Sequence, residues 1–124
     1  MAAPNIVGVT TILGITTSLT LTTSSQTILS NPASSGKVYK VNVITAANNS
    51  ASTANVTIRY NQGAAGAGTT IAIANGIDIA TKSSLVVLDK ASSIYLEEAR
   101  SLTALASANT SIDLVVSYED ITNL

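Results

Sequence analysis

The residues of this sequence that could do acid–base or metal chemistry are a few carboxylates in the last third of the chain. Glu97 and Glu98 are adjacent, so on a strand their side chains point to opposite faces. They therefore cannot form the facing pair that glycoside hydrolysis uses. Asp113, Glu119 and Asp120 offer the oxygen ligands that hard cations prefer, but no D-x-D-x-D-G calcium loop surrounds them. We expect these three to be solvated surface acids.

The other common catalytic groups are absent from the sequence. The chain has no Cys and no His, which removes disulfides, thiolate chemistry, the commonest metal ligand and the usual general base near neutral pH. Arg100 is expected to form a surface or interface ion pair with Glu97 and Glu98. We assign no catalytic, metal-binding or cofactor-binding residue and no cofactor, and we predict that the protein is not an enzyme.

Two further features could each bind a ligand, but each has a simpler structural explanation. The GAAGAG segment, residues 63–68, lacks the Lys-Ser/Thr of a P-loop and is followed by no helical pattern, so we expect a flexible hairpin loop. The only aromatic residues are four tyrosines, and most of them continue alternating apolar rows, which favours packing at the core edge. They are Tyr39, Tyr60, Tyr95 and Tyr118. With no Trp, a glycan-binding module is weakly supported.

The elements that would position these residues are short β-strands, most clearly in the stretch 84–121. Its last run places apolar side chains at every second position, which is typical of a strand with one face against a core. These side chains are Ile112, Leu114, Val116 and Tyr118. A turn at Glu98-Ala99-Arg100 should precede another strand, although helical spacing competes there. Leu85–Leu88 is apolar throughout, which indicates a strand buried on both faces or covered on one by a partner.

The middle of the chain alternates in the same way. Strands are predicted in residues 37–45, with Tyr39, Val41 and Val43 on one face, and in residues 56–60, with Val56, Ile58 and Tyr60 inward. Asn75-Gly76 is a strong hairpin signal between residues 70–74 and 77–79, and a bulge or bend is the alternative. We therefore predict an all-β, single-domain antiparallel β-sandwich, jelly-roll-like, over residues 1–124.

The first 36 residues carry no charge. They are either an extended N-terminal arm, suited to adding a strand to a neighbouring subunit, or two edge strands of the sandwich. They lack the basic n-region of a secretion signal, so we expect a protein made and used without export.

Only 10% of all residues are charged and the net charge is −1, while the chain holds 17 Thr and 16 Ser. Such a surface offers no basic patch for nucleic acid and no cationic face for a membrane. It is also poorly protected against self-association, which is expected of a subunit in an assembly.

Three segments carry a resemblance to a known family. MAAPNIV, SSGKVYKVN and LVVLDKASSIYLEEARSLTALASA with the later VSYEDI resemble small virion structural proteins of tailed phages, especially cyanophages. In that family Tyr-Leu-Glu-Glu is usually followed by Gly-Asp, whereas this chain has Ala99-Arg100. The resemblance covers about half of the chain, and its motifs are structural patterns.

The resemblance implies a β-sandwich subunit of a virion, assembled in the host cytoplasm, with other virion proteins as partners. The main expectation is a capsid decoration or cement protein that binds the head lattice and stabilises it, as a homo-oligomer such as a trimer. The alternative is a neck, tail or fibre component, with host contacts through loops around Asn48-Asn49 and Gly63–Gly68. A small glycan-binding module is a further alternative.

Overall fold

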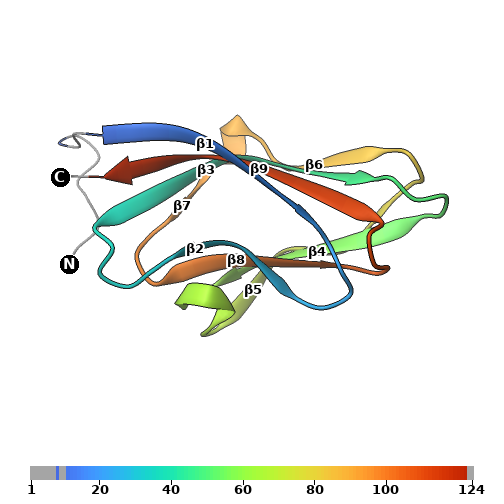
Figure 1. The fold of residues 1–124 in the computed structure, drawn as a ribbon, viewed down its shortest axis with the longest axis horizontal. Coiled ribbons are helices and arrows are strands. Elements are labelled where there is room, and N and C mark those ends of the chain that lie inside the picture. Colours follow the sequence, from blue (N-terminus) through green and yellow to red (C-terminus); the bar gives the residue numbers. More distant parts are fainter. Residues whose placement is uncertain (1–7, 9–10, 123–124) are drawn as a thin grey trace.

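The computed structural model describes residue 8 and residues 11–122, which form two antiparallel sheets packed face to face (Figure 1). Two short 3-10 turns interrupt the strands. The elements in chain order are β1 (Thr11–Thr20), β2 (Gln26–Asn31), β3 (Lys37–Asn48), β4 (Ala54–Asn61), η2 (Ala64–Gly66), β5 (Thr70–Ile79), β6 (Ser84–Leu88), η3 (Lys90–Ser92), β7 (Ile94–Leu96), β8 (Arg100–Ala106) and β9 (Ile112–Thr122).

The strand order is that of a jelly roll. Sheet A runs β1-β9-β3-β6, and sheet B runs β2-β8-β4-β5. The short β7 also pairs with β3, through Ile94 to Leu96, while β6 pairs with the other half of β3. Together β6 and β7 therefore occupy one edge position that the turn η3 interrupts. The prediction of an all-β, jelly-roll-like sandwich is confirmed.

The core lies between the sheets, and alternate residues of the four central strands β3, β4, β8 and β9 supply most of it. On β9, Ile112, Leu114 and Val116 are fully buried. On β4, Val56 and Ile58 are fully buried and face them from sheet B. The alternation predicted for both segments is confirmed, because each strand has one face on the core and one face outside.

A bulge in β3 breaks the alternation predicted for that strand. Tyr39 and Val41 face inward as expected, but the pairing with β9 shifts between Val41 and Val43. The next core residue is therefore Ile44, which is fully buried, whereas Val43 is only half-buried. A bulge adds one residue to one strand, so it reverses the facing of every side chain after it.

The hairpin predicted at Asn75-Gly76 is wrong, and the alternative of a bulge is what the structure contains. β5 is one continuous strand from Thr70 to Ile79. Its register against β4 shifts so that Asn75 and Gly76 together lie opposite Thr57. Gly76 has a φ of +62°, which glycine adopts without strain, so this Asn-Gly pair bends a strand instead of reversing the chain.

Leu85–Leu88 is an edge strand and is not buried on both faces. Val86 is 57% exposed on the outer face of β6, and Leu88, at 7% exposure, is the one buried residue in this run. The isolated chain thus leaves an apolar strand at the edge of sheet A. The predicted turn and strand that follow β7 are confirmed, with Ala99 at a positive φ and β8 starting at Arg100.

Residues 11–31 form two edge strands, β1 in sheet A and β2 in sheet B. The remaining part of the predicted N-terminal arm, residues 1–7 and 9–10, lies outside the described residues.

The glycine-rich segment is a hydrogen-bonded flap. It connects β4 to β5 and folds over the outer face of sheet B, where the Gly66 N–H donates to Ser101 Oγ and Ser101 Oγ donates to the Gly63 carbonyl. A Cβ on Gly63 or on Gly68 would lie within 3 Å of backbone atoms of the flap. The flap buries Ser101 and Thr103. It joins the antiparallel strands β4 and β5, so the prediction of a hairpin loop is confirmed.

Replacing the buried Val116 by Asp should unfold the sandwich. The substitution places an unpaired charge between the sheets, and we expect the free energy of unfolding to fall by about 3–5 kcal/mol. Val115→Asp is the matched control, because Val115 is 40% exposed on the other face of the same strand. Chemical denaturation measures both variants, and equal midpoints would show that the register of β9 is misassigned.

Candidate functional site

The carboxylates singled out above do not come together. Asp113 is the second residue of β9 and accepts hydrogen bonds from Thr20 and Asn49. Asp120 lies near the opposite end of the same strand, and Glu119 accepts a hydrogen bond from Asn42 on the outer face of sheet A. Within residues 11–122, no group of three or more acidic, His or Cys side chains could hold a metal ion.

Arg100 does not pair with the adjacent glutamates. Its guanidinium donates to the backbone carbonyls of Ala99 and Gln62. Glu98 instead accepts a hydrogen bond from the Gly36 N–H at 3.0 Å, which ties the turn after β7 to the loop before β3. The expected ion pair is therefore absent from the described residues, and both side chains hold loops in place.

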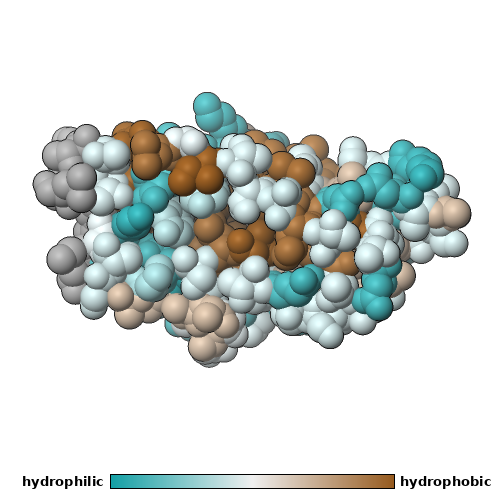
Figure 2. All heavy atoms as spheres, viewed as in Figure 1, coloured by the Kyte–Doolittle hydropathy of each residue, from teal (hydrophilic) through white to brown (hydrophobic). Residues whose placement is uncertain are grey.

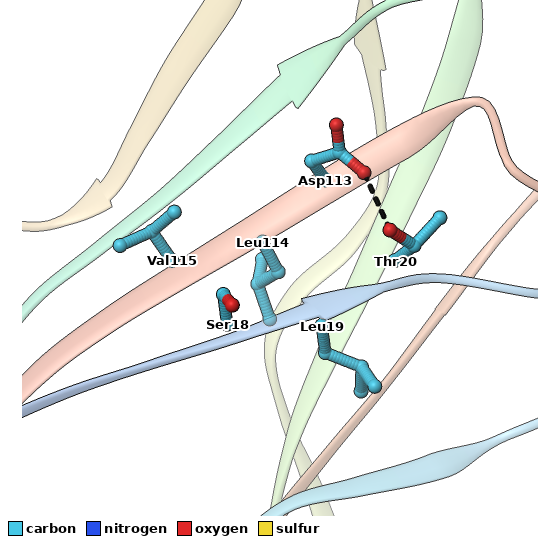
Figure 3. A pocket seen from close by; sticks show the side chains of 6 residues that line it. All are labelled: Ser18, Leu19, Thr20, Asp113, Leu114 and Val115. Carbon is cyan, nitrogen blue, oxygen red and sulfur yellow. Dashed lines mark hydrogen bonds between the residues drawn. The ribbon is translucent and has the colours of Figure 1, made fainter.

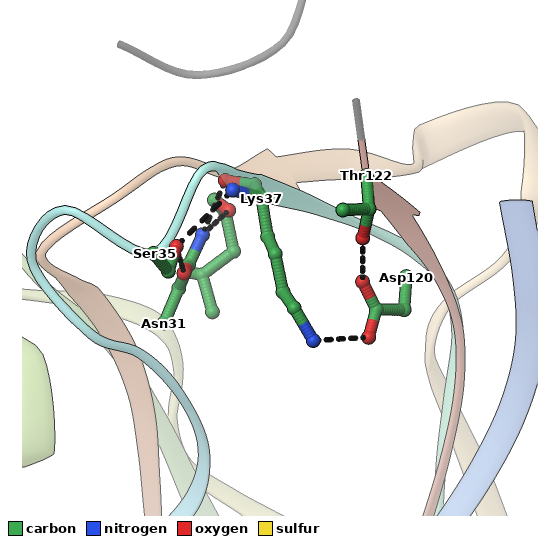
Figure 4. A network of polar contacts seen from close by, with 6 residues as sticks. Asn31, Ser35, Lys37, Asp120 and Thr122 are labelled. Atoms are coloured by element: carbon green, nitrogen blue, oxygen red, sulfur yellow. Dashed lines mark hydrogen bonds and ion pairs between the residues drawn. The ribbon is translucent and has the colours of Figure 1, made fainter. Parts of the chain in front are cut away.

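Asp120 forms an ion pair with Lys37 at the end of the sandwich nearest the C-terminus (Figure 4). Asp120 is only 7% exposed, so the expectation of a solvated surface acid is wrong for this residue. The Nζ–Oδ2 distance is 3.1 Å, and Thr122 donates to the second carboxylate oxygen. The hydrogen bond to Asp120, together with its negative charge, raises the pKa of Lys37. Beside this pair the rings of Tyr39 and Tyr118 lie 5.2 Å apart, and burial raises the pKa of both phenols.

Two buried asparagines stabilise opposite ends of the fold, a role that the sequence patterns did not predict. Asn31 is fully buried and donates to the carbonyls of Lys37 and Leu96, so it joins β2, β3 and β7 (Figure 4). Asn48 donates to the carbonyls of Ser52 and Ile79. Asn48 is only 1% exposed, so the predicted exposed loop at Asn48-Asn49 is wrong for its first residue. The sequence signal that could have indicated these roles is a serine that follows each asparagine within a few residues.

A shallow, open pocket of about 520 Å³ lies over β1 and β9 (Figure 3). Its lining is Ser18, Leu19, Thr20, Asp113, Leu114 and Val115. Thr20 Oγ1 donates to Asp113 Oδ1 at 2.7 Å, so the one charged residue in the lining already has a hydrogen-bond partner within the pocket. The pocket holds no arrangement of acid, base and nucleophile, and its importance is its position beside the free edge of β1.

One side of the sandwich, between β1 and β2, exposes part of the core. Leu13 and Ile15 lie on the inner face of β1, because they pair with Asp120 and Tyr118 of β9, yet Leu13 is 53% exposed. Leu19 and Ile28 are partly buried against the core on the same side. Figure 2 shows this side as a band of apolar atoms between the two layers.

The opposite side, between β5 and β6, has the same character. Ile71 and Ile77 lie on the inner face of β5, opposite Tyr60 and Val56 of β4, and are 48% and 42% exposed. Val86 is exposed on the outer face of β6, the edge strand of sheet A on the same side. Both sheets thus end in unpaired strands with apolar side chains at both sides of the molecule.

The edge strands are almost free of charge. As the structure bounds them, β1, β2, β5, β6 and β7 contain one charged residue, Asp78. The central strands contain seven, namely Lys37, Lys40, Arg59, Arg100, Asp113, Glu119 and Asp120. Soluble β proteins usually place charge, especially Lys, on their edges to prevent pairing with other chains. Here the charges lie on strands that are already paired on both sides.

Comparison with known proteins gives a likeness in fold. No protein-family model matches the chain, and no curated protein matches it. A solved structure, described as showing that Bacillus endospore appendages form a novel family of disulfide-linked pili, matches with a TM-score of 0.57 and 17% identity. The match covers 92% of this chain and 88% of the other, and at this identity it shows a shared fold.

This match contradicts the resemblance to a phage virion protein. Over 92% of its length the chain has the fold of a protein from bacterial pili, so the predictions of a capsid decoration protein, of virion partners and of a location in the virion are wrong. The segments that suggested a virion protein are strand and turn patterns, and unrelated β-sandwiches share such patterns. Among the described residues, no helix has the length and apolar character needed to cross a membrane.

Asn31→Ala should destabilise the fold strongly, because Asn31 is fully buried at the end of β2. The change removes two donated hydrogen bonds and one accepted from Ser35, and we expect a loss of about 2–4 kcal/mol in the free energy of unfolding. Ser35→Ala is the control: it removes the bond that Asn31 accepts and the bond from the Lys37 N–H to Ser35 Oγ, but it leaves both bonds donated by Asn31 and should cost less. Equal denaturation midpoints for Asn31→Ala and the parent chain would contradict this role.

Stability should fall as the pH rises above about 10. The folded state raises the pKa of Lys37 above its ordinary 10.5 and those of Tyr39 and Tyr118 above 10.0, so it holds protons that the unfolded chain releases. These contributions are complete below the unfolded pKa values and are lost as the pH rises through the folded ones. Thermal denaturation against pH measures the effect.

The control for the pH dependence is the triple variant Lys37→Met, Tyr39→Phe and Tyr118→Phe. It should lose less stability over the same alkaline range than the parent chain. An identical slope in both proteins would assign the alkaline loss to other groups.

Proposed function

We propose that this chain is a non-enzymatic structural subunit that associates with copies of itself, edge to edge, into a fibre. The observation that carries the proposal is the charge distribution: unpaired edge strands with one charge among them, flanked by exposed apolar side chains on both sides of the sandwich. Adding strands to an open edge supplies backbone hydrogen bonds, and the apolar side chains add buried area.

The two associating sides differ, which favours an open fibre over a closed dimer. One side presents β1 and β2, and the other presents β5 with β6 and β7. Contact between unlike sides is heterologous, so each added copy leaves one side free for the next. Each sheet of one copy would then continue into a sheet of its neighbour.

The shared fold supports the same conclusion, with one difference in the linkage. The matched protein is described as forming disulfide-linked pili. This chain has no Cys, so its copies cannot be joined by disulfides. Strand pairing and apolar contact would have to hold the fibre together without covalent bonds.

Lysines placed on one edge at a time test the proposal. Thr16→Lys with Ser18→Lys charges the exposed face of β1, and Ser84→Lys with Val86→Lys charges that of β6. Each double variant should remain monomeric alone, because one of its two unlike sides is blocked. When they are mixed, the free sides should combine into one-to-one heterodimers that grow no further.

Sedimentation velocity with electron microscopy distinguishes the outcomes. Ala51→Lys with Ala108→Lys adds the same charge in exposed loops and should assemble like the parent chain. Homodimers of either edge variant would show that like sides pair, which contradicts a heterologous fibre. Full assembly by both edge variants would contradict the use of these edges altogether.

A further inference from the structure

Asn75-Gly76 is the single Asn-Gly pair in the sequence, and it lies in the bulge of the edge strand β5. The Asn75 side chain is exposed. Gly76 has no side chain to shield its backbone nitrogen, and a Cβ built there would meet nothing within 4 Å. The peptide nitrogen that follows Asn75 is thus open except on the side of Thr57.

Thr57 closes that side with a hydrogen bond. The Gly76 N–H donates to Thr57 Oγ1 at 3.0 Å, and Thr57 is only 5% exposed. The bulge explains the bond: two residues of β5 face one residue of β4, which leaves a backbone donor without a ladder partner. The threonine hydroxyl satisfies it.

We propose that Asn75 is a site of spontaneous modification, at which the side-chain amide is lost at a rate set by the Thr57–Gly76 hydrogen bond. In this reaction the Gly76 nitrogen gives up its proton and attacks the Asn75 side-chain carbonyl carbon. A C–N bond forms, ammonia leaves, and a five-membered succinimide results. Water then opens either carbonyl of the ring to give aspartate or isoaspartate at position 75.

The hydrogen bond opposes the first step in two ways. The N–H must lose its proton before the nitrogen can attack, and Thr57 Oγ1 holds that proton within a buried contact. The contact also fixes the peptide in the bulge, so attack requires local opening of β5. Edge strands open at low free-energy cost, which makes the reaction slow but not absent in the folded chain.

The modification would change both the charge and the backbone of the exposed edge strand β5. Either product adds a negative charge to the edge strands, whose one charged residue is otherwise Asp78. Isoaspartate also adds a methylene group to the backbone, which a paired strand cannot absorb without a change of register.

Incubation of the folded protein at mildly alkaline pH, followed by peptide mass spectrometry, tests the inference. Thr57→Val keeps the side-chain shape and removes the acceptor, so amide loss at Asn75 should accelerate by about three- to tenfold, the factor equivalent to one neutral hydrogen bond. Thr57→Ser keeps the hydroxyl and should react at the parent rate. The Asn49 and Asn109 peptides of the same digests serve as internal controls and should not change.

Two results would overturn the inference. One is an unchanged rate in Thr57→Val while hydrogen exchange shows that its Gly76 amide is no longer protected. The other does not depend on a variant: the parent chain should react more slowly when folded than when unfolded in urea, and equal rates would show that the fold does not control this site.

Discussion

Every strand inside a sheet is paired on both sides, but each sheet of an open sandwich must end in two strands that are paired on one side. In this protein those strands are β1 and β6 with β7 in sheet A, and β2 and β5 in sheet B. Most of the charged residues in the strands lie elsewhere: seven are on the central strands and one is on the edge strands. Unpaired backbone with apolar flanks is therefore the feature on which the proposed assembly depends.

The rest of the structure keeps this arrangement rigid. Asn31 and Asn48 hold the two ends of the sandwich through buried hydrogen bonds, and the Lys37–Asp120 pair joins β3 to β9 near the chain end. The flap at residues 63–68 covers the polar outer face of β8. With the ends tied and this outer face partly covered, the open sides between β1 and β2 and between β5 and β6 remain for contact with other copies.

Periodicity predicted the fold class and the facing of β4 and β9, because alternation over five or more residues has one structural solution. Periodicity failed at Val43, and the Asn75-Gly76 turn signal led to a bulge instead of the predicted hairpin; in both places a bulge changes the register. A bulge depends on the partner strand, which a local pattern does not contain. The apolar run Leu85–Leu88 predicts a strand buried on both faces or covered on one by a partner, because a single sequence does not show which strands end a sheet. Recognition by short segments failed for a related reason: strand and turn patterns recur among unrelated sandwiches.

Hydrogen exchange of the assembled protein against the monomer tests the central claim most directly. If copies join through their edges, backbone amides of β1, β2, β5 and β6 should exchange more slowly in the assembly. The amides of β3, β4, β8 and β9 are already paired on both sides and should change little. Slower exchange confined to the loops, with the four edge strands unaffected, would contradict edge-to-edge assembly.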